Sequence, residues 1–147
     1  MKLKQLEGLL GSIQQFPNPK LELEQYPTGP HIASRLVYTA ENTFGDVNGK
    51  VVADFGCGCG TLGIAGALMD ADYIMGFDID SQSLETASQN VELIEICKGK
   101  AEWGWGGLKQ GGLDLDLGWF ARICARTDVG SVLEVVPRDW EGGGQRS

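Results

Sequence analysis

Long apolar stretches are missing from this 147-residue chain. No run approaches the roughly 20 residues that a membrane-spanning helix needs. Polar residues at Lys4, Gln5 and Glu7 interrupt the N-terminal segment, which therefore has no unbroken apolar core of the kind a secretory signal requires. We expect a protein that is not secreted, has no membrane partner and resides in the cytoplasm and/or nucleus.

Residues that commonly bind metals are also scarce. The sequence holds one histidine, His31, and four cysteines, Cys57, Cys59, Cys97 and Cys124. Cys57 and Cys59 form a C-x-C pair, whereas zinc sites commonly use C-x₂₋₄-C together with a second pair or clustered histidines. We therefore expect no metal site and a reducing compartment. We interpret His31 as a residue that orients a loop, with acid–base catalysis as the alternative.

Basic residues are few in the first 96 positions. That segment has five Lys and Arg against 13 Asp and Glu, a net charge of −8, whereas residues 97–147 have seven of each. Nucleic-acid affinity depends on cationic groups that meet phosphates, so the acidic segment alone is a poor electrostatic binder of RNA or DNA. All four tryptophans lie beyond residue 100 and could stack on bases, but no basic groove is predicted around them.

The elements predicted up to about residue 96 alternate between helix and strand. Hydrophobic spacing, prolines and β-branched runs predict them. In order, they are a helix over residues 3–13, an extended proline-rich segment over 16–29, a helix from Pro30 to 42–45, a strand over 50–55, a helix over 61–69, a strand over 73–78 and a helix after Asp80 or Ser81. This order is the first half of a doubly wound parallel sheet.

The character of the sequence changes after about residue 96. Half of the 22 glycines lie in residues 97–147, and residues 102–119 show neither a helical nor a sustained strand period. The pattern therefore predicts no regular structure over residues 102–119 as a whole. Farther along, we expect a short helix over residues 117–125, a strand over 131–136 and a flexible end over 141–147.

The glycine-rich stretch between the first predicted strand and helix has the form D-x-G-x-G-x-G. It comprises Asp54, Gly56, Gly58 and Gly60. A loop of this kind presents backbone N–H groups and a helix N-terminus to a ligand. Its spacing differs from the G-x-G-x-x-G of dinucleotide sites and is typical of S-adenosylmethionine (SAM) loops in class I methyltransferases, where it wraps the amino-acid portion of SAM. A tight turn without a ligand is the alternative.

An acidic residue follows at the end of the second predicted strand. Asp78 lies close to the roughly 20-residue spacing at which an acidic side chain accepts the ribose hydroxyls in nucleotide folds. Asp80 is either a helix N-cap or a partner of another residue at the ligand site. Cys57 and Cys59 are interpreted as small residues that fill the loop.

Three stretches closely resemble the methyltransferase-like protein 5 family of SAM-dependent ribosomal RNA adenine-N6 methyltransferases. They read LEQYPTGPHIASRLVYTAENTF, KVVADFGCGCGTLGI and GFDID. The resemblance covers about residues 19–96, and the EQYPT-x-PHIA stretch together with DxGCGCG is specific for this family. It implies an α/β, Rossmann-like class I SAM-dependent methyltransferase fold, incomplete here because only the first half of the parallel sheet is predicted.

The resemblance also implies roles for individual residues and partners. Gln25 and Thr28 would close over the cofactor, Gly56, Cys59 and Thr61 would line it, and Asp78 would hold the ribose. The implied substrate is an adenosine of small-subunit ribosomal RNA. The implied protein partner is a small zinc-binding activator subunit.

The sequence departs from the family pattern near residue 96. The family has an Asn-Pro-Pro-Phe motif that binds the target adenine, whereas no Asn-Pro dipeptide follows Asn18–Pro19 here and Pro137 stands alone. We therefore assign no catalytic residue. We predict an N-terminal helix over 1–18, a SAM-binding half-domain over 19–96 and an unrelated Gly- and Trp-rich tail over 97–147, as in a truncated or alternative isoform. The alternative function is a non-catalytic isoform that binds SAM weakly or competes for the activator.

Overall fold

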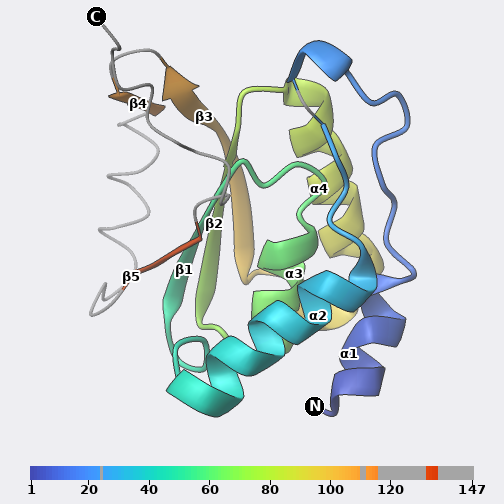
Figure 1. Cartoon of the computed structure of the whole chain (residues 1–147), viewed down its shortest axis with the longest axis vertical. Coiled ribbons are helices and arrows are strands. Elements are labelled where there is room, and N and C mark those ends of the chain that lie inside the picture. The colour runs from blue at the N-terminus through green and yellow to red at the C-terminus, as the bar shows by residue number, and fades with distance from the viewer. Residues whose placement is uncertain (24, 110–111, 116–131, 136–147) are drawn as a thin grey trace, which may run out of the picture.

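One sheet runs through the described part of the chain, which comprises residues 1–23, 25–109, 112–115 and 132–135 of this computed structural model. Its strand order is β4-β3-β2-β1-β5 (Figure 1). The strands are β1 Val51–Phe55, β2 Tyr73–Asp78, β3 Ala101–Lys109, β4 Gly112–Leu115 and β5 Val132–Val135. β1 is parallel to β2 and β5, β2 is parallel to β3, and β4 is antiparallel to β3. The order β3-β2-β1-β5 corresponds to the 3-2-1-4 order of a Rossmann-like sheet.

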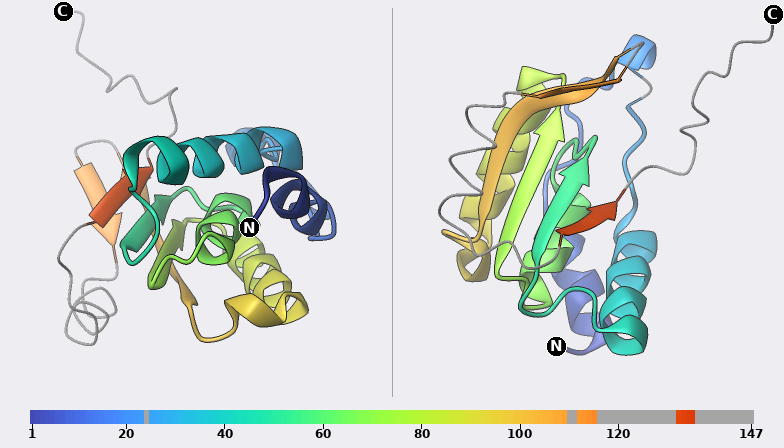
Figure 2. Two further views of the ribbon diagram at one scale, coloured as in Figure 1. Left: turned by 90° about the horizontal axis from the view of Figure 1, so that it is seen from below. Right: turned by 90° about the vertical axis from the view of Figure 1, so that its left-hand side faces the viewer.

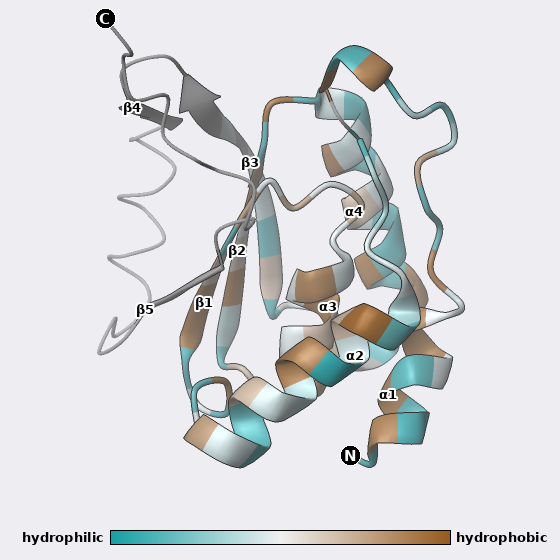
Figure 3. Cartoon of the chain, viewed as in Figure 1, coloured by the Kyte–Doolittle hydropathy of each residue, from teal (hydrophilic) through white to brown (hydrophobic). Residues whose placement is uncertain are grey.

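The α-helices of the described residues cover one face of this sheet (Figure 1, Figure 2). They are α1 Leu3–Leu10, α2 Pro30–Thr39, α3 Thr61–Leu68 and α4 Ser81–Leu93. The shorter helical turns are η1 Leu21–Leu23, η2 Ala40–Phe44 and η3 Glu95–Cys97. α3 contacts α1, α2 and strands β1, β2 and β3, and its largely apolar composition contrasts with the polar residues of α4 (Figure 3). No described helix is long and apolar enough to cross a membrane.

Strands β1 and β2 separate two buried clusters because successive side chains of a strand point to opposite faces. Val52 and Ile74 join the main core beneath the helices. On the other face, the second cluster contains Val51, Ala53, Met75 and Phe77. The Phe55 and Phe77 rings stack there with centroids 5.0 Å apart. These contacts hold the carboxyl ends of β1 and β2 side by side, where the predicted glycine loop begins.

Trp103 attaches β3 to the helix layer. The register places Trp103 beside Gly76 of β2, and a Cβ at Gly76 would overlap the Trp103 ring. A Cβ at Gly60 would lie 2.9 Å from Trp103 Cη2. The absence of side chains at these two glycines therefore makes room for the indole and lets β3 pair with β2.

The Rossmann-like α/β class predicted from the sequence is confirmed, and the described residues form only part of that fold. The expected helices and strands up to α4 are present with small shifts at their ends, and η1 is a short helical turn within the proline-rich segment. The predicted strand over residues 131–136 is confirmed as β5. The domain boundary near residue 96 stays a prediction.

The expectation of no regular structure over residues 102–119 is wrong for the described part, which contains β3 and β4. Trp and Gly alternate at positions 103–106 with the period of a strand. Glycine is depleted in strands, which concealed that period. The helix predicted over residues 117–125 and the flexible end over 141–147 lie outside the described residues.

Candidate functional site

The glycine loop joins the carboxyl end of β1 to the first turn of α3. Gly56, Gly58 and Gly60 have φ of 77°, 52° and 85°, in the left-handed region that residues with a Cβ avoid. Gly58 is constrained a second time, because a Cβ there would lie 2.8 Å from Phe16 Cζ. Gly60 occupies the N-cap position of α3. The three glycines thus permit a tight loop whose backbone is approached closely by a neighbouring segment.

A solvent-open cleft lies against this loop. One wall is the loop with the start of α3, and the other comes from the segment between α1 and α2. The lining residues are Gln15, Phe16, Tyr26, Pro27, Thr28, Asp54, Gly56, Cys57, Gly58, Cys59, Thr61 and Leu62. This cleft, which we call the loop pocket, combines backbone groups, two aromatic side chains and one carboxylate.

Asp54, the carboxylate of the loop pocket, is almost fully buried at the end of β1. Its Oδ2 atom accepts a hydrogen bond of 3.2 Å from the backbone N–H of Gly63 in α3. Burial raises the pKa of Asp54 to about 7, although the Gly63 hydrogen bond opposes that rise and the charge of Asp78 adds to it. A cation or N–H donor in the pocket would favour the ionised form of Asp54.

The carboxylate of Asp78, at the end of β2, binds the backbone of the glycine loop. Its Oδ2 atom accepts a 2.8 Å hydrogen bond from the backbone N–H of Gly58, and its Oδ1 atom accepts a 2.9 Å bond from that of Asp80. An ionised carboxylate offers about four lone-pair sites. Asp78 therefore keeps acceptor capacity for further donors while it fixes the loop.

Asp80 connects the segment between α1 and α2 to α4. Its carboxylate accepts hydrogen bonds from Lys20 Nζ at 2.7 Å, Gln25 Nε2 at 2.7 Å and Ser83 Oγ at 2.9 Å. Burial opposes ionisation, but these hydrogen bonds and the Lys20 charge hold the pKa of Asp80 well below its usual range. Asp80 occupies the N-cap position of α4 without a side-chain capping bond. The N-cap interpretation of Asp80 thus holds for its position, and its role at the ligand site stays a prediction.

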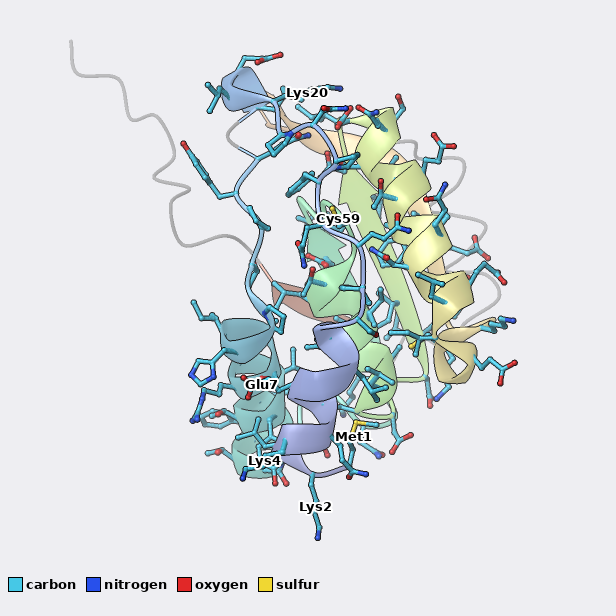
Figure 4. The ribbon with its side chains drawn as sticks, turned by 90° about the vertical axis from the view of Figure 1, so that its right-hand side faces the viewer. Met1, Lys2, Lys4, Glu7, Lys20 and Cys59 are labelled. Carbon is cyan, nitrogen blue, oxygen red and sulfur yellow. The ribbon has the colours of Figure 1, made fainter. Side chains whose placement is uncertain are left out.

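Asn90 of α4 makes a second connection to the same segment. It is fully buried; its Oδ1 atom accepts from the backbone N–H of Gln14 at 2.7 Å, and its Nδ2 atom donates to the Gln14 carbonyl at 2.8 Å. Nδ2 also donates to the Cys59 carbonyl at 2.9 Å. The Asn90 side chain thus ties the glycine loop to the facing wall of the loop pocket. Cys59 of the loop and Lys20 of the facing segment lie toward the same end of the molecule, away from Met1, Lys2 and Lys4 (Figure 4).

Gln15 contributes a buried polar atom to the loop pocket. Its Oε1 atom is inaccessible to solvent and has no hydrogen-bond partner in the part of the chain that the structure describes. A buried acceptor without a partner is unusual in a native structure and points to a missing donor.

The loop cysteines carry protonated thiols. Burial, followed by the charges of Asp54 and Asp78, raises the pKa of Cys57 well above its ordinary value. Burial, with Asp78 and Asp80, raises the pKa of Cys59 to about 11. Nucleophilic attack and metal ligation use the thiolate, and the described residues contain no cluster of three or more potential metal ligands.

The structure brings most of the predicted site residues together. Those that line the loop pocket are Thr28, Asp54, Gly56, Gly58, Cys59 and Thr61. Gly60 caps α3 and Asp78 lies under the loop, whereas the amide of Gln25 is directed to Asp80 and Ser83. Their roles in binding stay predictions. His31 lies on α2, where it pairs with Glu7 at 3.1 Å, outside the set of pocket-lining residues.

Sequence reasoning missed Gln15, Phe16 and Tyr26. All three line the loop pocket, yet Phe16 and Tyr26 belong to a segment whose prolines predict only an extended conformation, and Gln15 lies between that segment and the first predicted helix. Hydrophobic periodicity reports local structure, so it cannot reveal that residues so distant in sequence face each other across a pocket. The aromatic residue opposite Gly58 could be inferred only after the loop had been placed in space.

Comparisons with known proteins place this site in context. Residues 26–106 match the family model described as ribosomal protein L11 methyltransferase (PrmA). The rRNA N(6)-adenosine-methyltransferase METTL5 of Danio rerio is 52% identical over 96 residues, which cover 65% of this chain and 46% of the relative. The Drosophila melanogaster protein of the same description, Mettl5, is 42% identical over 96 residues, covering 65% and 45%. The chain therefore spans about half the length of the curated relatives it matches.

A solved structure is similar to this chain over most of its length. The crystal structure of PH1948 from Pyrococcus horikoshii aligns with a TM-score of 0.65 and 34% sequence identity, covering 71% of this chain and 51% of that one. The alignment thus relates 71% of this chain to about half of a larger solved chain.

Proposed function

The chain belongs to the family whose model is described as ribosomal protein L11 methyltransferase (PrmA), and on this premise we propose that it binds SAM in the loop pocket. The resemblance to the methyltransferase-like protein 5 family is confirmed by the METTL5 and Mettl5 relatives. The observation that supports SAM binding best is the glycine loop itself, with Asp54, Gly58 and Asp78 brought together at the ends of β1 and β2. When bound, SAM supplies a methyl group on a positively charged sulfur.

The residues of the loop pocket fit such a ligand. The lining residues include the carboxylate of Asp54 and the unpartnered oxygen of Gln15. Among the described residues that line the pocket, none carries a basic side chain. SAM brings a sulfonium and an ammonium group, so its positive charges complement the acceptors on the pocket walls. The Cβ-free position at Gly58 lets the loop backbone approach a ligand closely.

Individual residues would bind and orient SAM in distinct ways. We propose that Asp78 accepts the ribose hydroxyls with the acceptor capacity left by its two backbone bonds. Thr28 and Thr61, on opposite walls of the pocket, would enclose the ligand, and Gly56 and Cys59 would line it. Gln25 would close the segment over SAM through its hydrogen bond to Asp80.

For the reaction, we propose methyl transfer to N6 of an adenosine in small-subunit ribosomal RNA. The support is the 52% identity to a relative described as an rRNA N(6)-adenosine-methyltransferase. The acidic first 96 residues offer little electrostatic attraction for RNA. The resemblance to the methyltransferase-like protein 5 family implies a small zinc-binding activator subunit, and we propose that this partner contributes to RNA binding. Residence in the cytoplasm and/or nucleus stays a prediction.

Two measurements on the full chain test the proposed function in sequence. Calorimetric titration with SAM measures binding, and transfer of a labelled methyl group to ribosomal RNA, with the activator subunit present, measures activity. Binding together with adenine-N6 methylation would support the proposal. A chain that binds no SAM would contradict it.

A second candidate is a non-catalytic chain that binds SAM weakly or competes for the activator. The sequence favours it because β5 is followed by Val136 and Pro137, where the family pattern has Asn-Pro-Pro-Phe after the fourth strand. Without the Asn amide, the target adenine amine would lack its orienting acceptor. SAM binding without methyl transfer would support this second candidate.

A further inference from the structure

Gln15 is held against the glycine loop by the residues on both sides of it. The backbone of Gln14 is fixed by two hydrogen bonds from the buried Asn90 side chain, which also binds the Cys59 carbonyl. On the other side, the Phe16 ring packs on Gly58. The position of Gln15 relative to the loop is therefore set by contacts that do not involve its own side chain.

The oxygen atom of the Gln15 side chain lacks a hydrogen-bond donor among the described residues. Its Oε1 atom is buried without a partner among the described residues, and the side chain lines the loop pocket. A carbonyl oxygen only accepts hydrogen bonds, so its partner must carry an N–H or O–H group. The Asp54 carboxylate, which lines the same pocket, makes a positively charged donor especially favourable.

We propose that Gln15 accepts a hydrogen bond from the α-ammonium group of bound SAM and thereby selects ligands that carry an amino-acid portion. This inference rests on the proposed function, in which the glycine loop wraps that portion of the ligand. The other N–H donor of SAM is the adenine amine. Asp78, which is proposed to accept the ribose hydroxyls, is outside the set of pocket-lining residues, whereas Gln15 lines the pocket together with Asp54.

Two ligands distinguish a contact with the ammonium group from a contact with the adenine amine. S-adenosylhomocysteine carries the ammonium group, whereas 5′-methylthioadenosine keeps the adenine and ribose but lacks the amino-acid portion. Calorimetric titration of the full chain with each ligand, for wild type and for Gln15→Met, isolates the contribution of Gln15 to one part of the ligand. Gln14→Met is the matched control, since Gln14 is the adjacent residue of the same type and its side chain is exposed.

We expect Gln15→Met to weaken S-adenosylhomocysteine binding about tenfold, which corresponds to about 1.4 kcal/mol. Methylthioadenosine binding should change less than about twofold, and Gln14→Met should leave both affinities unchanged. The ligand-free melting temperature of Gln15→Met should be unchanged or raised, because the substitution removes a buried acceptor without a partner. A structural role for Gln15 would lower that melting temperature instead.

The outcomes distinguish this inference from the proposed function. If wild type binds S-adenosylhomocysteine and Gln15→Met binds it equally well, Gln15 makes no such contact and the inference is overturned. An equal loss for both ligands would assign Gln15 to the adenine side or to general pocket structure, and would also overturn it. If wild type binds neither ligand, the proposed function fails and the inference fails with it.

Discussion

Asn90 donates a hydrogen bond from Nδ2 to the carbonyl oxygen of Cys59 over 2.9 Å, although 31 positions separate them in sequence. The same side chain binds both backbone groups of Gln14. It therefore connects α4, the glycine loop and the facing wall of the loop pocket through one buried amide.

The first prediction concerns this buried amide. Asn90→Ala leaves three backbone groups without their partner, namely the buried Cys59 carbonyl and the part-buried N–H and carbonyl of Gln14, so we expect it to lower the free energy of unfolding by about 2–3 kcal/mol. Urea unfolding followed by circular dichroism measures the change. Gln89→Ala, at the exposed neighbouring position of α4, is the control and should change stability little. Equal effects of the two substitutions would contradict the role assigned to Asn90.

The second prediction concerns the pH dependence of stability. The folded-state pKa of Asp54 is about 7, above its unfolded value of about 4. The folded state therefore binds the proton more tightly, and the stability this gives is fully present below about pH 4 and is lost as pH rises toward 7. For Asp54 alone, the loss is at most about 4 kcal/mol.

Asp54→Asn should remove this dependence, because the amide does not ionise. Unfolding free energies of wild type and Asp54→Asn, measured at pH 5 and pH 8, should diverge in favour of the variant at the higher pH. Asp72→Asn, at an exposed position before β2, should follow wild type at both. If the difference in unfolding free energy between wild type and Asp54→Asn is the same at both pH values, the prediction is refuted.

The third prediction separates backbone strain from steric overlap at the loop. Gly45 and Gly58 both have positive φ, but a Cβ at Gly45 meets open space whereas one at Gly58 would press on Phe16. We expect Gly45→Ala to cost about 1 kcal/mol and Gly58→Ala about 2 kcal/mol or more. Only Gly58→Ala should weaken S-adenosylhomocysteine binding. Thermal melting and calorimetry provide the two measurements, and identical behaviour of the two variants would refute the steric role of Phe16.

The fourth prediction concerns the connection through Asp80. Because hydrogen bonds from Lys20 and Gln25 depress the folded-state pKa of Asp80, its stabilising contribution is present above the unfolded pKa of about 4 and declines as pH falls. Asp80→Asn should therefore be less stable than wild type by about 1–3 kcal/mol at pH 7. The difference should shrink below about pH 4. Urea unfolding at pH 7 and pH 3 tests this, and a constant difference would rule out the assigned charge contribution.

Much of the architecture could be predicted from local patterns. The β-branched run at 51–55, the glycines that follow and the apolar spacing in α4 each carry information within a few residues, and all three elements are present. Strand β3 was hidden because its glycines depress strand propensity. Its position depends on Trp103 packing over Gly76, which is a contact between distant residues.

The site could be predicted only in part for the same reason. Asp54 and the loop glycines follow from strand, loop and helix in succession, and all but Gly60 line the loop pocket. The other wall of the pocket follows from tertiary contacts made by Asn90 and Asp80. No spacing rule places Gln15 opposite the loop, because contacts from α4, which is distant in sequence, fix the position of the segment that contains Gln15.

Titration of the full chain with S-adenosylhomocysteine tests the central claim most directly, if wild type, Asp78→Ala and Asp72→Ala are measured together. Asp78 ends β2 beneath the glycine loop, whereas Asp72 is exposed before the opposite end of that strand. The loop-pocket account predicts one-to-one binding by wild type and Asp72→Ala, and a loss of at least about tenfold in affinity for Asp78→Ala. No binding by wild type, or equal binding by all three proteins, would contradict it.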